Sequence, residues 1–378
     1  MLHRNVIVLS TADYESAVWT NKQHIASRLA DSGVRVAYIN SLGLRRPTFQ
    51  IHDLRRMARR LQAGRRVAAV HSPLNLQVHS PRVVPFHGSR LVRRVNASIL
   101  RRQLIGLPWS DSTLWTFSPV TYGLETDARQ VVYHSVDLLH TLPGVPSAAL
   151  LEAESQLIRR ADVVIASSRG VAEHLEGLGR KDVQLWPNVA DTSAYEAATR
   201  RSEERERRAI FAGNLTPAKI DFAILEALAD SGVELALAGP VSVDGTRNGS
   251  RLNDLMSHRR VTYLGNLSSE ELAVECASSM VGLIPYLRNA YTAGVHPMKL
   301  YEYLSSGLSV VATPLQSLTG ETVEGLHIHE PADFPTFVRH EIDSFDEAVA
   351  RQRQEAARGH SWEARLEQVA AVLDRENN

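Results

Sequence analysis

The chain has 378 residues, 44% of them hydrophobic, with 42 basic and 42 acidic side chains. These numbers predict a soluble globular protein that is long enough for two domains. The single cysteine, Cys276, excludes a disulfide scaffold and indicates a reducing compartment. The apolar run at residues 6–9 is too short for a signal peptide, and no stretch approaches the roughly 18 apolar residues of a membrane span. We therefore expect a cytoplasmic protein.

The basic side chains are concentrated in the first half. Residues 1–190 contain 24 lysines and arginines against 14 acids, whereas residues 191–378 contain 18 against 28. Between Arg45 and Arg102 there are 14 arginines and one acid, Asp53. Such a patch suits an anionic membrane surface or a phosphorylated partner.

Within this patch, residues 51–66 and 90–105 each place apolar side chains on one helical stripe with arginines around it. A basic amphipathic helix of this kind either lies on the inner face of an anionic membrane or packs on the protein's own sheet. We expect no nucleic acid partner, because no recognised base-reading module and no interleaved aromatic residues accompany the arginines.

Short apolar runs alternate with segments of helical period along the first half of the chain. This alternation predicts βαβ units and a parallel sheet. Gly33 is expected to end a helix over residues 21–31. The predicted strands are residues 5–10, 35–40, 113–117, 130–133, 161–166 and 183–186.

A charged run, residues 200–208, predicts a solvated linker between two domains. We expect a first domain over 1–192, a charged linker over 193–208, a second domain over 209–358, and a C-terminal helix over 359–378 that packs back on the first domain.

A second βαβ series follows, with a helix expected from Ala218 and another over 269–279. The predicted strands are residues 209–213, 233–239, 261–265, 281–285 and 309–313. The inferred fold is α/β, with two doubly wound Rossmann-like domains facing each other across a cleft. Ligands of such sheets bind beyond the carboxyl ends of the strands, which directs attention to the loops after 209–213 and 281–285.

The segment "HPMKLYEYLSSG" carries signals for a helix with a functional face. Pro297 suits the first turn, and Gly307 suits the end. Lys299 and Glu302 then share one face. The free N–H groups and Lys299 would attract an anion such as a diphosphate, and Glu302 would accept hydrogen bonds from sugar hydroxyls. An ordinary helix-surface ion pair explains the same spacing.

Lysine is rare in this chain, which has 38 arginines and four lysines, at positions 22, 181, 219 and 299. A compact ammonium fits among phosphate oxygens where a guanidinium fork does not. Lys219 follows Thr216 and Pro217, which are expected to open a helix directly after a strand. Gly213, at the end of that strand, lets the backbone approach a phosphate.

Residues 289–315 resemble the donor-binding stretch of retaining glycosyltransferases with the GT-B fold. Four other parts of the chain agree with that family in the same order: residues 19–39, 133–137 with 161–168, 187–195 and 211–221. The resemblance implies that Glu302 binds ribose or sugar hydroxyls of a nucleotide-sugar and that Lys299 and Lys219 neutralise its diphosphate. It also implies that the loop of Gly213 and Asn214 passes beside the diphosphate.

Two positions depart from the family, and one of them, Ser309 in place of a usual proline, is expected to be a harmless change at a strand start. Many relatives have a glutamate that contacts the donor sugar where this chain has Gly294. The Gly294 backbone N–H, or nearby Thr292 and His296, would take over that contact, which leaves the transferred sugar open.

Candidates for the acceptor side come from the first domain. His134 and Asp137 follow the strand 130–133 and are expected at a carboxyl end of the sheet. His134 would hydrogen-bond the donor sugar or the incoming hydroxyl, unless it is a satisfied loop histidine, and Asp137 is either in the site or a helix cap. Four side chains either touch the acceptor or cap the first helix: Trp19, Asn21, Lys22 and Gln23.

The hypothesis that follows is a glycosyltransferase acting with retention in surface polysaccharide, glycolipid or natural-product synthesis, on a glycan or lipid-linked acceptor. Lys219, Lys299 and His134 are its catalytic candidates, because stabilising charge on the leaving diphosphate is the main electrostatic task. We expect no cofactor and no metal, since no Asp-x-Asp cluster lies near these loops. The alternatives are a nucleotide-sugar epimerase or hydrolase, and a binding partner without catalysis. A dehydrogenase is disfavoured, because no G-x-G-x-x-G follows a predicted strand.

Overall fold

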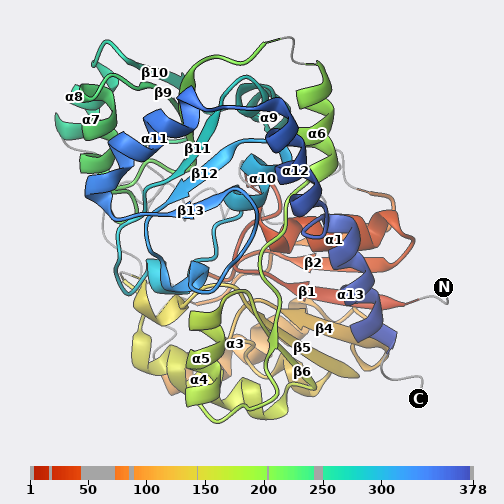
Figure 1. The fold of residues 1–378 in the computed structure, drawn as a ribbon. Helices are drawn as coiled ribbons and strands as arrows, with labels where there is room; N and C mark the ends of the chain where they lie inside the picture. Colours follow the sequence, from red (N-terminus) through yellow and green to blue (C-terminus); the bar gives the residue numbers. More distant parts are fainter. Residues whose placement is uncertain are drawn as a thin grey trace. The chain divides into compact units, whose positions relative to one another are not determined.

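The computed structural model describes residues 4–16, 19–43, 73–84, 89–142, 144–201, 204–241 and 250–374. The chain divides into two compact units (Figure 1). The first unit comprises Met1–Pro187 and Gln368–Asn378, and the second comprises Asn188–Glu367. The predicted amphipathic segment 51–66 lies outside the described residues.

The first unit contains a seven-stranded sheet in which every neighbouring pair is parallel, in the order β3-β2-β1-β4-β5-β6-β7. The order reverses between β1 and β4, which is where doubly wound sheets bind ligands. The strands are β1 (Asn5–Leu9), β2 (Arg35–Ile39), β3 (Leu76–His79), β4 (Ser112–Thr116), β5 (Gln130–Ser135), β6 (Val163–Ala166) and β7 (Gln184–Leu185).

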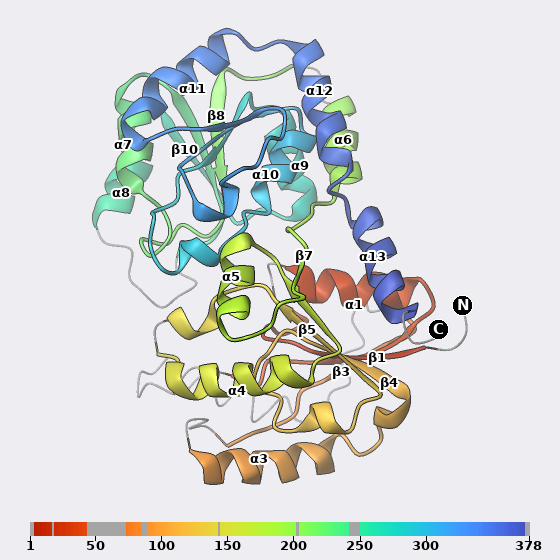
Figure 2. The ribbon, with the colours of Figure 1, turned by 60° about the horizontal axis from the view of Figure 1, so that its bottom comes forward.

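Helices cover both faces of this sheet. Leu100 of α3 and Leu150 of α4 pack with Ile7 and Leu9 of β1 on one face, and Figure 2 shows α1 and the end of α13 on the other. Gly33, with φ +92°, ends α1 as predicted. The helices are α1 (Asn21–Asp31), α3 (Arg90–Gln103), α4 (Ser147–Arg160), α5 (Arg169–Gly177) and the end of α13 (Trp362–Asp374), with 3₁₀ turns η1 (Trp109–Asp111), η2 (Leu124–Thr126) and η3 (Leu139–Thr141).

The second unit contains a six-stranded parallel sheet in the order β10-β9-β8-β11-β12-β13. One face packs against α7, α8 and α11 and the other against α6, α9, α10 and α12 (Figure 1). The strands are β8 (Arg208–Ala212), β9 (Glu234–Ala238), β10 (Val261–Gly265), β11 (Val281–Ile284), β12 (Ser309–Ala312) and β13 (Leu326–Ile328). The helices are α6 (Thr192–Arg201), α7 (Phe222–Asp230), α8 (Ser250–Met256), α9 (Ser269–Ala277), α10 (Lys299–Ser305), α11 (Phe334–Asp343), α12 (Glu347–Arg358) and the start of α13, with 3₁₀ turns η4 (Thr292–Gly294), η5 (Gln316–Leu318) and η6 (Pro331–Asp333).

The change from the first unit to the second comes earlier than the charged segment 193–208. The chain crosses between Pro187 and Asn188, and α6 and the start of β8 occupy that segment. The Arg205 side chain is 6% exposed and donates to the carbonyls of Ser279 and Ser306 at 2.8 and 2.7 Å. This arginine joins two loops of the second unit, so the charged run is not solvated throughout, although Arg200 and Arg207 are exposed.

The C-terminal helix contributes to both units, since residues 368–374 of α13 belong to the first. Gln130 of β5 donates from Nε2 to the Val372 carbonyl at 3.2 Å. No helix in the described ranges has the length and apolar character needed to cross a membrane.

The helix predicted to begin at Ala218 is present, but its predicted start is wrong. α7 begins at Phe222, after Asp221, whose carboxylate accepts from the Ala223 N–H at 3.1 Å. Thr216 and Pro217 form a turn instead, closed by the Lys219 N–H on the Thr216 carbonyl at 3.1 Å. Proline favours turns and helix starts alike, and the acidic cap further along decides where the helix begins.

Candidate functional site

Two glycine loops meet at the carboxyl ends of β8 and β9 in the second unit. The Gly213 N–H donates to the Ala238 carbonyl at 2.9 Å. A Cβ atom at Gly239, whose φ is +125°, would lie 2.1 Å from the Gly213 carbonyl oxygen. Only glycine permits this approach, because the obstructing atom belongs to the backbone. Gly213 and Asn214 therefore lie in a fixed loop at a strand end.

Lys219 follows in the same loop and contacts the loop after β11. Ile220 and Tyr286 form an antiparallel bridge, and the Leu287 N–H donates to the Lys219 carbonyl at 2.8 Å. The Lys219 ammonium lies 4.3 Å from the centroid of the Tyr286 ring. At this distance the cation is attracted to the ring face.

The helix start and end of the "HPMKLYEYLSSG" segment are largely as predicted. The Leu300 N–H donates to the Pro297 carbonyl at 3.2 Å, and α10 extends from Lys299 to Ser305. Gly307, with φ +78°, follows, and the Leu308 N–H returns to the Tyr303 carbonyl at 3.0 Å. This closure is the usual end of a helix at a left-handed glycine.

Lys299 and Glu302 form an ion pair on α10, with side chains 21% and 13% exposed. Burial acts to lower the pKa of the Lys299 ammonium, but the Glu302 carboxylate offsets this and leaves that pKa above its ordinary value. Tyr195 of α6 lies against the same carboxylate, and burial followed by the Glu302 charge raises the pKa of its hydroxyl. The site therefore holds a charged lysine and a carboxylate in a half-buried setting.

Tyr286 lies next to one of the two predicted lysines. Its ring lies under the Lys219 ammonium. Lys219 thus contacts the loop that follows β11, and Lys299 lies further along the same connection, at the start of α10. The sequence analysis missed Tyr286, although its position directly after a predicted strand is a usable signal.

Tyr303 holds α10 against the sheet. The sequence analysis did not identify this residue either. Its hydroxyl accepts from the Ala212 N–H at 2.8 Å. A Cβ atom at Gly282 would lie 2.3 Å from the Tyr303 ring, so the ring occupies the space that a side chain on β11 would fill. Glycine in a strand often marks such a close approach.

Thr292 and His296 are both buried. The Thr292 hydroxyl is engaged inside its own loop, where it accepts from the Asn289 N–H at 3.0 Å and donates to the Leu287 carbonyl. The His296 side chain is 1% exposed and stacks on Tyr301. Burial, with smaller contributions from His360 and Arg365, lowers the pKa of His296 to about 4. Both side chains support the loop, and Gly294 lies between them in η4.

In the first unit, His134 lies inside β5 rather than in a loop after it. Its ring is fully buried, with ring centroids 5.0 Å from Phe117, 6.1 Å from Trp115 and 6.0 Å from Trp186. The prediction that placed His134 beyond the strand is wrong by two residues, because β5 continues to Ser135.

Lys22 lies at the carboxyl ends of the central strands. It is 6% exposed, and its ammonium is 5.9 Å from the Phe117 ring centroid, just beyond β4. Burial lowers the pKa of Lys22, and the nearby Asp137 carboxylate partly restores it. The two predicted residues Lys22 and Asp137 thus interact electrostatically at this sheet edge.

The remaining predicted residues surround the start of α1. Gln23 caps the helix, because its Oε1 accepts from the Thr20 N–H at 3.1 Å. Trp19 is 36% exposed and packs on Tyr14, with a centroid distance of 5.3 Å. Asn21 is buried at the first position of the helix.

No family model matches the sequence. A protein of Bacillus subtilis (strain 168) with the provisional name teichuronic acid biosynthesis glycosyltransferase TuaH is 28% identical over 271 residues. The match covers 64% of this chain and 66% of that protein, slightly less than two thirds of its length.

Solved structures match nearly the whole chain at low identity. Sucrose-phosphate synthase from Thermosynechococcus elongatus covers 99% of both chains, with a TM-score of 0.69 and 15% identity. Anabaena HepE in complex with UDP and glucose covers 99% of this chain and 100% of its own, with a TM-score of 0.68 and 16% identity. A UDP-forming trehalose-phosphate synthase from Burkholderia xenovorans covers 98% of both chains, with a TM-score of 0.64 and 14% identity.

The chain has the GT-B fold. The predicted α/β class with two doubly wound Rossmann-like sheets is confirmed. In this GT-B chain the predicted donor-side residues belong to the second unit: the Gly213 loop, Lys219, and Lys299 and Glu302 of α10. The predicted acceptor-side residues belong to the first unit: Lys22, His134 and Asp137.

Proposed function

We propose that this protein is a glycosyltransferase that moves a sugar from a nucleotide-sugar to a hydroxyl acceptor. The observation that carries the proposal is that Lys219, which lies over the Tyr286 ring, and the Lys299–Glu302 ion pair of α10 follow the neighbouring strands β8 and β11 at their carboxyl ends, beside the Gly213 loop. The name of the Bacillus relative supports the activity, and the UDP and UDP-glucose complexes of HepE support a uridine donor as the first to test.

The proposed donor site assigns a role to each group. Lys219 and Lys299 balance the charge that grows on the diphosphate as its bond to the sugar breaks. A well-placed donor in such a site is worth about 3 to 4 kcal/mol of transition-state stabilisation. Glu302 accepts hydrogen bonds from ribose or sugar hydroxyls, and the Gly213 and Asn214 backbone passes beside the phosphates. Retention of configuration, supported by the resemblance of residues 289–315, and metal-independent transfer, supported by the lack of an Asp-x-Asp sequence near these loops, complete this proposal.

The acceptor side of the proposal rests on the first unit. Lys22 lies near Phe117 at the carboxyl ends of the central strands with Asp137 as a charge partner, and His134 packs on the same Phe117 ring. The relative's name supports a role in polysaccharide synthesis, for which a lipid-linked or glycan acceptor is suited.

Membrane association through α3 forms part of the proposal. Three apolar side chains on or next to this helix are strongly exposed: Leu91 at 71%, Val95 at 44% and Ile105 at 83%. Arginines flank them, although Arg93 and Arg101 pair with Glu152 and Asp127. Exposed apolar and basic side chains on one helix suit an anionic leaflet.

Release of nucleoside diphosphate tests the activity. Purified protein is incubated with labelled UDP-sugars, with and without a membrane extract that supplies acceptors. A transferase releases UDP only when an acceptor is present, and the label moves to the acceptor. Release without acceptor would indicate a hydrolase, conversion of the sugar without release an epimerase, and binding without turnover an inactive partner.

A further inference from the structure

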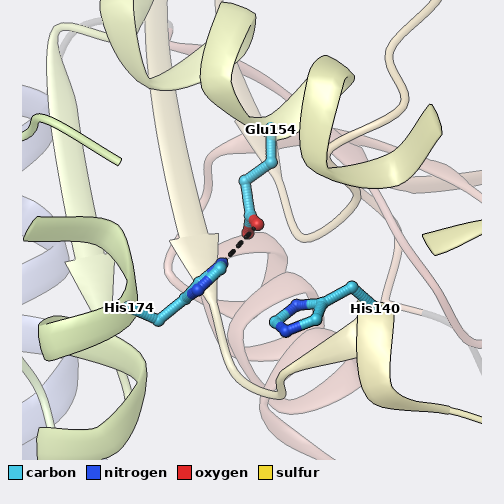
Figure 3. Close-up of side chains that lie close together, drawn as sticks. All are labelled: His140, Glu154 and His174. Atoms are coloured by element: carbon cyan, nitrogen blue, oxygen red, sulfur yellow. Dashed lines mark hydrogen bonds and ion pairs between the residues drawn. The ribbon is translucent and has the colours of Figure 1, made fainter. Parts of the chain in front are cut away.

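Three further side chains of the first unit come together. They are His140 of η3, Glu154 of α4 and His174 of α5, as Figure 3 shows. Each offers a ligand atom, and these atoms all lie within 4.8 Å of one another. This is the one group of three or more His, Cys, Asp or Glu side chains within the described ranges that is suited to hold a metal ion.

Glu154 occupies an unusual place for a carboxylate. α4 directs Leu150, Leu157 and Ile158 into the core, and Glu154 lies on the same stripe, one turn after Leu150. It is 5% exposed. A carboxylate in such a position is costly unless hydrogen bonds or a cation balance it. The position therefore requires partners, which other elements supply.

The two oxygens of Glu154 have separate partners. The Tyr133 hydroxyl donates to Oε1 at 2.5 Å, and Nε2 of His174 lies 2.7 Å from Oε2. Tyr133 thereby orients the carboxylate with Oε2 toward the histidines. A hydrogen-bonded outer partner of this kind is a regular part of metal sites, where it fixes the ligand's direction.

His140 completes the group from a different segment. Its ring stacks on that of His174, with centroids 4.5 Å apart and planes 27° apart. It is half-buried on a single 3₁₀ turn, so its ring can turn about the side-chain bonds without displacing a helix.

We propose that His140, Glu154 and His174 bind one divalent ion of the zinc class, which ties the segment after β5 to α4 and α5. Two imidazoles and one carboxylate suit Zn²⁺ and similar transition ions, whereas Ca²⁺ and Mg²⁺ prefer oxygen ligands throughout. Three protein ligands leave a fourth position for water or another group. The site does not depend on the proposed transferase activity.

Coordination requires small movements. Bonds of about 2.0–2.1 Å in tetrahedral geometry place two ligand atoms about 3.3 Å apart. The described separation of 2.7 Å between His174 and Glu154 is that of a hydrogen bond. The ion therefore replaces the shared proton and widens this pair by roughly half an ångström, and His140 leaves its stack because imidazole binds metals in the plane of its ring.

The test uses the full chain, stripped with a chelator and titrated with Zn²⁺ against a chromophoric competitor, and in parallel with Co²⁺, whose visible spectrum reports tetrahedral nitrogen and oxygen ligands. We expect one ion per chain, displacement of Co²⁺ by Zn²⁺, and a higher unfolding temperature with Zn²⁺. Absence of binding by either ion in the unaltered protein would overturn the proposal.

Variants locate the ion. His140→Ala removes a ligand but leaves the Glu154 hydrogen bonds, so it should fold. Loss of an outer partner alone weakens metal affinity about 10- to 100-fold, and loss of a ligand should cost at least that much. His79→Ala, in β3 of the same unit, serves as the control and should bind as the unaltered protein does. Equal affinity of His140→Ala and His79→Ala would show adventitious binding elsewhere and refute the site.

Discussion

The Lys299 ammonium forms an ion pair with the Glu302 carboxylate, which supports its charge in a half-buried position. This pairing keeps Lys299 protonated at neutral pH, because the carboxylate raises its pKa despite burial. The charge is therefore available to a phosphate when a ligand enters, which is the role we propose for it.

Replacing Lys299 should impair catalysis far more than folding. Lys299→Ala is expected to lower kcat about 10²- to 10³-fold, as removal of one oxyanion-stabilising donor does. The control is Lys181→Ala, which alters an exposed lysine before β7. Initial rates of UDP release with saturating acceptor measure the effect. Near-normal turnover in Lys299→Ala would remove this lysine from the diphosphate site.

His296 should make stability depend on pH. Its pKa is about 4 in the folded protein and about 6.5 in an unfolded chain. Between these values the folded protein binds fewer protons, so the free energy of unfolding should fall as the pH is lowered from 6.5 to 4, by up to a few kcal/mol.

His296→Phe tests this contribution. Within the part of the chain that the structure describes, the buried ring nitrogens have no hydrogen-bond partner, so phenylalanine should preserve the stack on Tyr301. Urea unfolding at several pH values should show that the free energy of unfolding of His296→Phe falls less on lowering the pH from 6.5 to 4 than that of the unaltered protein. His340→Phe, on the exposed side of α11, is the comparison. An unchanged decline in His296→Phe would disprove the assignment.

Two tyrosines of α10 differ in one respect that a paired experiment can use. The Tyr303 hydroxyl accepts from the Ala212 N–H, whereas the buried Tyr301 hydroxyl has no hydrogen-bond partner among the described residues. Tyr303→Phe leaves a buried N–H unsatisfied and should cost about 1–3 kcal/mol of unfolding free energy. Tyr301→Phe should be neutral or slightly stabilising. Equal losses in urea denaturation would mean that this hydrogen bond does not position α10.

At the scale of elements, the strands were largely predictable because parallel strands are buried on both faces and appear as apolar runs. β3 was missed, since Leu76–His79 is short and mixes polar with apolar residues. The end of α10 was predictable from Gly307. The start of α7 was not, because Thr216 with Pro217 and Asp221 both carry start signals and only packing selects between them.

The candidate site was predictable as a set of residue types but not as a geometry. The lysines were conspicuous because lysine is rare in this chain, and the helix motif indicated Glu302. The contact of Lys219 with Tyr286 joins residues from two loops, which no periodicity in the sequence reports. His134 and His296 were expected to contact the substrates, yet both are buried, and neighbouring aromatic rings pack against them.

At the scale of the whole molecule, the uneven charge and the exposed apolar side chains of α3 predict membrane binding. Vesicles with anionic lipid should sediment with the protein at low salt, and the bound fraction should fall steeply as salt rises. Leu91→Ser with Ile105→Ser should weaken binding further, while Leu185→Ser, at an exposed site on β7, should not. Vesicle binding that does not change with salt concentration, or no vesicle binding at all, would contradict the proposed membrane-binding role of α3.

Nucleotide binding tests the central claim most directly. The unfolding temperature is measured with UDP, GDP, dTDP and ADP, for the unaltered protein and for Glu302→Ala, Lys299→Ala and Lys181→Ala. A nucleotide at 100 times its Kd adds about 2.7 kcal/mol to stability. We predict stabilisation by UDP in the unaltered protein and Lys181→Ala, and a much smaller effect in the two site variants. No stabilisation by any nucleotide, or equal stabilisation of all four proteins, would contradict a donor site at Lys299 and Glu302.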